Sequence, residues 1–131
     1  MADNELLQQW LDKASEDLRV AEYLSTMHHP TPNEAICFHC QQSSEKYLKA
    51  FLVLNDIDPP KIHNLLDLMY MCEKINNNFN VLLPQLDVLR GYAVLPRYPN
   101  ELEINDEDMK VAIRYANIVQ EFVLKVIDEN E

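Results

Sequence analysis

The sequence predicts an all-α fold, an antiparallel up-and-down bundle of four to five helices. Apolar residues recur at three- and four-residue intervals through most of the chain, which is the spacing of one helical face. Only one of the 131 residues is glycine, and this scarcity disfavours folds that need many turns of positive φ. No strand alternation or internal repeat stands out. A chain of this length forms one core, so residues 1–131 are expected to be a single domain.

The first two predicted helices end where prolines occur. One spans residues 4–27, and the prolines within residues 28–32 end it because proline cannot continue a helix. The next spans residues 33–55, and the Asp-Pro-Pro sequence at 58–60 closes it. Each helix has an apolar stripe that is expected to face the core. The first stripe contains Leu7, Trp10, Leu11, Ala14, Leu18, Ala21 and Leu24, and the second contains Ile36, Cys40, Ser43, Tyr47, Phe51 and Leu54.

Three further helices are predicted in the second half of the chain. They span residues 64–75, residues 81–92, and a final segment that starts near residue 105 or 106 with acids that suit the helix dipole. Gly91 is expected either to cap the second of these helices or to allow close helix packing. The two prolines within residues 96–99 predict a rigid, non-helical connector before the last helix.

Composition limits the location of the protein. No run of about 18 apolar residues exists, so no membrane span is expected. The first residues lack the basic start and apolar stretch of a secretory signal. Three cysteines is an odd count, so a disulfide framework is not expected. The sequence therefore predicts a cytoplasmic protein.

The net charge of −11 disfavours a protein that binds nucleic acid over its whole surface, because a polyanion would be repelled. The acidic excess is not uniform along the chain. Residues 31–99 contain seven acidic and six basic residues, whereas the two flanking segments hold the rest of the acidic surplus. A local site for an anion is therefore expected in the middle of the chain.

The polar residues of the second predicted helix are the first candidate site. Gln42, Glu45, Lys46 and Lys49 are spaced by three and four, so they share the face opposite the apolar stripe. Lysine and arginine side chains that converge from separate elements can hold a phosphate group. The alternative is a solvated face on which Glu45 and Lys49 form an ion pair. Further basic candidates follow in the sequence, namely Lys61, His63, Arg90 and Arg97.

Two of these candidates lie in predicted connectors. His63 could serve a ligand site if a partner lies nearby, or it could cap the following helix or orient the loop. Arg97 lies between Pro96 and Pro99, which leaves its backbone little freedom. Its side chain is positioned either for a ligand or for a neighbouring carboxylate.

Cys37 and Cys40 form a Cys-x-x-Cys pattern, but no second ligand pair follows at the spacing of a zinc site. We therefore expect buried structural cysteines. The Glu-x-x-His sequences that a di-metal bundle needs are absent, and a single glycine excludes a phosphate-binding loop. No metal and no cofactor is expected.

Four motifs occur in order along the chain: Asp17-Leu18-x-x-Ala21, Gln42-x-x-Glu45-Lys46-x-x-Lys49-Ala50, His63-x-Leu65 and Arg97-Tyr98-Pro99. With them, the chain resembles the HEPN domain family over nearly its whole length. The resemblance implies a helical bundle, usually dimeric, that binds a nucleotide or RNA. It also implies a minimal nucleotidyltransferase as partner in a two-component, toxin–antitoxin-like pair. The ligand-binding residues that it implies are Gln42, Lys46, Lys49, His63, Arg97 and Tyr98.

One motif of the ribonucleases in that family is missing. They carry an arginine followed, after four to six residues, by a histidine near the last helices, and no histidine follows Arg90, Arg97 or Arg114 here. Attack by a ribose 2′-hydroxyl needs a base and a cation placed together. We therefore expect a non-catalytic binding module. The alternatives are a ribonuclease toxin with a divergent site built from His63 and Arg97, and a purely structural dimeric adaptor.

Overall fold

The computed structural model describes residues 4–93 and 103–129. Over these residues it contains five α-helices, two short 3₁₀ segments and no strand, which confirms the predicted all-α bundle. The elements are α1 (Asn4–Leu24), α2 (Asn33–Leu54), α3 (Leu65–Glu73), η1 (Asn77–Leu82), α4 (Leu83–Leu89), η2 (Arg90–Tyr92) and α5 (Asp106–Glu129).

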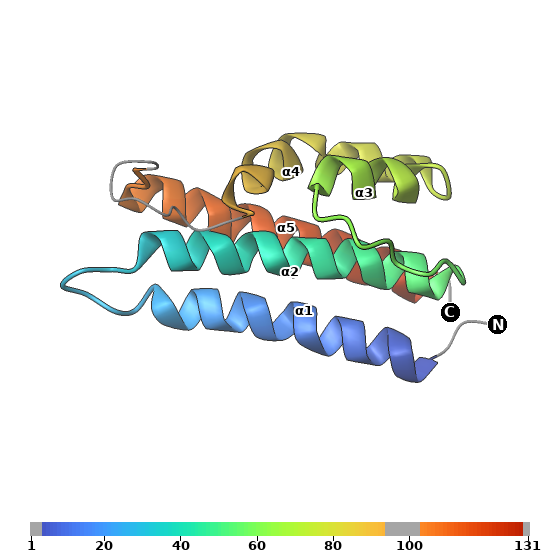
Figure 1. The fold of residues 1–131 in the computed structure, drawn as a ribbon, viewed down its shortest axis with the longest axis horizontal. Helices are drawn as coiled ribbons and strands as arrows, with labels where there is room; N and C mark the ends of the chain where they lie inside the picture. Colours follow the sequence, from blue (N-terminus) through green and yellow to red (C-terminus); the bar gives the residue numbers. More distant parts are fainter. Residues whose placement is uncertain (1–3, 94–102, 130–131) are drawn as a thin grey trace.

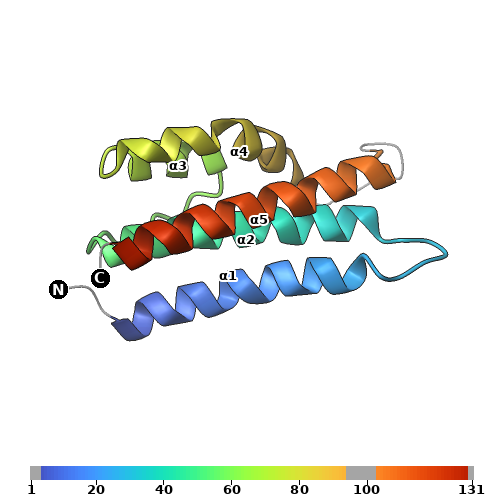
Figure 2. The same ribbon diagram turned by 180° about the vertical axis from the view of Figure 1, so that it is seen from behind.

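Helix α2 is the centre of the bundle. The three long helices α1, α2 and α5 lie side by side, and α3 and α4 form a shorter layer on the side away from α1 (Figure 1). Both α1 and α5 pack against α2, α3 packs on α2, and α4 packs mainly against α5 and α3. The view from behind shows α5 alongside α2, with α1 on one side and the short layer on the other (Figure 2). Every other helix therefore contacts α2.

Because of this position, α2 is buried on several sides. More than half of its 22 residues are buried, and they include the predicted apolar stripe residues Ile36, Cys40, Tyr47 and Phe51. Polar residues of α2 are buried as well, and they are Gln41, Ser43, Ser44, Glu45 and Lys49, of which Ser43 belongs to the apolar stripe. These buried groups must then find partners within the protein rather than in water. Among the described residues, all of them do so except the Oγ of Ser44.

The short layer differs from the prediction in detail. The segment expected as one helix over 81–92 is α4 with a 3₁₀ segment at each end. Gly91 lies in η2 without a positive φ, and a Cβ built on it would meet nothing within 4 Å. Both expected roles of this glycine, as a left-handed cap and as a close-packing site, are therefore wrong. Asn64, not His63, caps α3, because its side chain accepts from the backbone N–H groups of Leu66 and Asp67 at 2.9 and 3.2 Å.

The three cysteines are buried and free, as predicted for structural cysteines. Burial raises the pKa of the Cys37 thiol to about 12, and it raises the pKa of Cys72 to about 12 as well. Such thiols stay protonated and unreactive near neutral pH. In the part of the chain that the structure describes, no group of three or more His, Cys, Asp or Glu residues could hold a metal ion.

None of the described helices is long and apolar enough to cross a membrane.

The core contains a contiguous aromatic group that joins three elements. The ring centroids of Phe51 (α2) and Phe79 (η1) lie 4.4 Å apart, and those of Phe79 and Phe122 (α5) lie 5.0 Å apart in an edge-to-face arrangement. Phe79 thus attaches the short layer to both long helices.

Replacing this fully buried ring should destabilise the protein strongly. We expect Phe79→Ala to lower the free energy of unfolding by roughly 3–5 kcal/mol, because it removes aromatic contacts and leaves a cavity. Val81→Ala, two residues further along η1 and 57% exposed, is the control and should change it by less than about 0.5 kcal/mol. Urea unfolding followed by circular dichroism measures both, and a similar loss in the two variants would contradict the central role of Phe79.

Candidate functional site

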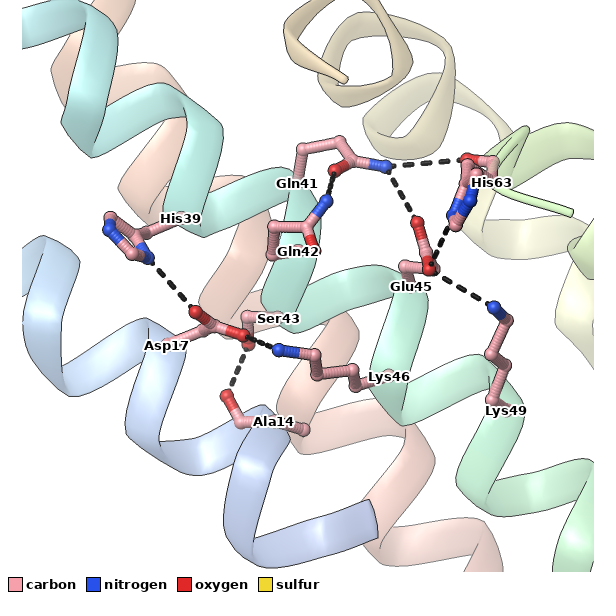
Figure 3. A network of polar contacts seen from close by, with 10 residues as sticks. All are labelled: Ala14, Asp17, His39, Gln41, Gln42, Ser43, Glu45, Lys46, Lys49 and His63. Carbon is pink, nitrogen blue, oxygen red and sulfur yellow. Dashed lines mark hydrogen bonds and ion pairs between the residues drawn. The ribbon is translucent and has the colours of Figure 1, made fainter. Parts of the chain in front are cut away.

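Glu45 is a buried carboxylate in the middle of α2, and three side chains surround it (Figure 3). The Nζ of Lys49 lies 3.1 Å from its Oε2, and the Nδ1 of His63 lies 3.0 Å from the same oxygen. Its Oε1 accepts a 3.3 Å hydrogen bond from the Nε2 of Gln41. The side chains of Glu45 and Lys49 are each only 6% exposed. These extra hydrogen bonds satisfy the carboxylate, which is the condition for a stable buried ion pair.

His63 connects this carboxylate to the segment that leads into α3. An ionised carboxylate can only accept, so the Nδ1 of His63 carries the proton and Nε2 is the acceptor of the neutral ring. The Nε2 of Gln41 also donates to the backbone carbonyl of His63 at 3.3 Å, which fixes the connector as well as the ring. Yet 71% of the His63 side chain is exposed. The imidazole is therefore held in place by α2 and still open to a ligand.

A second carboxylate, Asp17, ties α1 to α2. It accepts from the Nδ1 of His39 at 2.9 Å and from the Nζ of Lys46, while the Oγ of Ser43 donates to the carbonyl of Ala14 at 2.8 Å (Figure 3). Asp17 is nearly buried, and about a quarter of the Lys46 side chain is exposed. Lys46 thus lies on the α1 side of α2, while His63 lies on the side of the short layer.

The alternative interpretation, a solvated polar face on α2, is therefore wrong at Glu45 and Lys49, because both side chains are buried. Glu45 and Lys49 do form the expected i,i+4 pair, but they form it in the interior. Gln42 is half-buried, and its Nε2 donates to the Oε1 of Gln41 at 2.7 Å. The other two predicted ligand residues, Arg97 and Tyr98, lie outside the described residues.

Two depressions flank this network, and they share no lining residue among those that the structure describes. The first, which we call the His63 depression, has a volume of about 600 Å³ and is lined by His63, Asn64, Asp87, Arg90, Gly91 and Ala93. The second, which we call the Trp10 depression, has a volume of about 350 Å³ and is lined by Leu6, Gln9, Trp10, Lys13 and Lys46. The structure thus brings His63 together with Arg90, and it places Lys46 elsewhere.

Sequence reasoning misses the residues that hold the candidates in place. Gln41 precedes Glu45 by one helical turn, so the spacing could have suggested their contact. Asp17 enters the sequence reasoning only as part of a motif, and its pairing with Lys46 joins positions 29 residues apart. Trp10 is predicted for the core stripe, although it is half-buried and lines a depression.

The Glu45 network makes a strong prediction about stability. Glu45→Gln should lower the free energy of unfolding by roughly 3–5 kcal/mol, because it leaves the buried ammonium of Lys49 without an opposite charge. The double variant Glu45→Gln/Lys49→Met should recover part of the loss. Glu107→Gln is the control, since its pair with Lys110 is exposed at 3.7 Å and should contribute almost nothing. Chemical denaturation measures all three, and a Glu45 variant as stable as the control would contradict the buried pair.

Comparison with known proteins identifies the fold and the family. The model of the HEPN domain matches residues 7–127. A protein of Methanocaldococcus jannaschii named "Putative toxin MJ1304" is 29% identical over 136 aligned residues, which cover 92% of this chain and 87% of that protein.

Two crystal structures are similar over most of both chains. TT1696 from Thermus thermophilus matches with a TM-score of 0.74 and 24% identity, covering 91% of this chain and 96% of its own. ST0689, an archaeal HEPN homologue, matches with a TM-score of 0.71 and 23% identity, covering 92% and 97%. These likenesses show the same helical fold. Because the family model spans almost all of the described bundle, this chain belongs to the HEPN domain family.

Proposed function

We propose that this chain is a HEPN-type binding module that holds the phosphate of a nucleotide or of RNA without cleaving it. The observation that carries the proposal is the His63 depression, where an imidazole and a guanidinium line one opening. Its volume of about 600 Å³ falls in the usual range of small-ligand sites. Both groups can donate charge-assisted hydrogen bonds to phosphate oxygens when the imidazole is protonated.

Arg90 is the best available cation in this depression. Its Nε lies 2.9 Å from the Oδ1 of Asp87, and both side chains are about half exposed. An exposed ion pair contributes little, so a phosphate dianion can compete with Asp87 for the guanidinium. Arg97 and Tyr98 follow Ala93, the last described residue of the lining, by four and five positions in the sequence, and we keep both in the proposed site.

In this proposal, the predicted ligand residues Lys49 and Gln42 of α2 do not contact the phosphate but hold the residues that orient His63. Lys49 is buried and holds Glu45, which in turn orients His63. Gln42 supports Gln41, the residue that bonds both Glu45 and the His63 carbonyl. They are positioning residues, whereas His63 and Arg90 contact the phosphate.

We further propose that the module is a homodimer that works with a minimal nucleotidyltransferase in a two-component, toxin–antitoxin-like system. Membership of the HEPN family and a relative named as a toxin support this assignment. The acidic surplus on the terminal segments would suit a basic surface on the partner.

Removing the Arg90 guanidinium should weaken phosphate binding. We expect Arg90→Ala to reduce affinity for a short labelled RNA roughly tenfold, since a hydrogen bond to a charged group is worth about 1.5–3 kcal/mol. Arg19→Ala removes the same charge from an exposed position of α1, on the other side of α2, and should bind nearly as wild type (Figure 1). Fluorescence anisotropy at fixed salt measures both. Equal binding by the two variants and the wild type would contradict the phosphate site and favour a structural adaptor.

A ribonuclease with a divergent site is the second candidate, because the same depression favours it. The Nε2 of a neutral His63 can act as a base, and Arg90 lies in the same lining to stabilise developing negative charge. If this candidate is right, the protein cleaves a labelled RNA and His63→Ala abolishes the cleavage, while a 2′-deoxy substrate stays intact. Intact RNA after incubation with the wild-type protein supports the binding module instead.

A further inference from the structure

The Trp10 depression is lined by residues of α1 and by Lys46 of α2, whereas the His63 depression is lined by residues that follow α2, and the Trp10 lining combines an aromatic side chain with two lysines. We propose that the Trp10 depression binds a mononucleotide, whose base stacks on the indole of Trp10 and whose phosphate pairs with Lys13 and Lys46. The inference rests on the proposed function in that both take a nucleotide phosphate as ligand. It adds a second binding site, separate from the His63 depression, at which the base of the nucleotide is bound as well as the phosphate.

The wall of the depression suits a flat apolar group. Trp10 is half-buried and packs against the core, and Leu6 precedes it by one helical turn in the same lining. The Nζ of Lys49 lies 5.9 Å from the centroid of the indole, so the ring is supported from within the bundle. Aromatic side chains fixed in this way are the usual stacking surfaces for unpaired bases.

The two lysines supply the charge for a phosphate. Lys46 is anchored on Asp17, which leaves further N–H groups of its ammonium to donate to a ligand. Lys13 follows Trp10 by three residues on α1, is exposed, and forms no ion pair with the described part of the chain. Two cations beside an apolar wall in a chain of net charge −11 favour an anion that carries a planar apolar group.

The volume also favours a mononucleotide. A depression of about 350 Å³ lies near the lower end of the range for small-ligand sites, so it suits one base with its sugar and phosphate. Its described lining residues all belong to α1 and α2, which Asp17 holds together, so the depression is formed before a ligand arrives.

Trp10 is the only tryptophan, so its fluorescence reports on this depression directly. We expect adenosine 5′-monophosphate to quench the emission saturably, adenosine to quench it at higher concentration, and inorganic phosphate not to quench it. Trp10→Leu should lose AMP binding in calorimetry. Failure of AMP to quench, or equal quenching by phosphate alone, would overturn the stacked base.

Lysine variants test the phosphate contact without disturbing the core. Lys13→Ala should weaken AMP binding roughly tenfold, in line with the loss of one charge-assisted contact. Lys74→Ala, at the end of α3 in the opposite layer, is the matched control and should leave it unchanged (Figure 1). Wild-type affinity in Lys13→Ala would overturn the assignment.

Arg90→Ala separates this inference from the proposed function. It should leave AMP quenching intact, because Arg90 lines only the other depression. Quenching that persists while the RNA experiment fails would leave the Trp10 depression as a nucleotide site and remove the His63 site. Quenching that disappears in Arg90→Ala would place AMP in the His63 depression and overturn the present inference.

Discussion

The carboxylate of Glu45 is buried in the middle of the central helix, and removing it from water costs free energy that only nearby groups can offset. Lys49 supplies the opposite charge from the next turn, and Gln41 supplies a donor from the previous one. His63 completes the set only because the segment after α2 runs back along that helix (Figure 1). The same contacts therefore fix the path of the chain into α3 and the orientation of the exposed imidazole.

Asp17 has a corresponding role on the other side of α2. Between them, the two carboxylates engage both lysines of the predicted phosphate site, Lys46 and Lys49, in ion pairs. One consequence is that both lysines already have a carboxylate partner, Lys46 between α1 and α2 and Lys49 within α2, before they can serve any ligand. Another is that the two cations of the depressions without a buried carboxylate partner in the described part of the chain, Lys13 and Arg90, lie at the edges of the network, on α1 and at the end of α4.

The helices and most of their ends could be predicted because apolar spacing and proline positions are local signals. The contact between Glu45 and Lys49 could be predicted for the same reason, since i,i+4 neighbours meet on any helix. Their burial could not, because a polar stripe has the same spacing whether water or another segment covers it. The partner that His63 required is Glu45, 18 residues away, and no local pattern specifies such a contact. The expectations for Gly91 failed for a related reason, because a glycine can adopt a positive φ but its presence in the sequence does not show that it does so.

The negative net charge is compatible with a local anion site because electrostatic interactions are screened over short distances in salt. At physiological salt an exposed charge is felt over roughly 8–10 Å, so a small anion in either depression meets the local cations rather than the total of −11. A long RNA differs, because its phosphates must also pass over the acidic terminal segments and are repelled there. Under the proposed function, the same cations would thus hold a mononucleotide or a short single-stranded end, while the rest of the surface would repel a polyanion. The uneven charge of the chain would then select for the size of the ligand as well as for its phosphate.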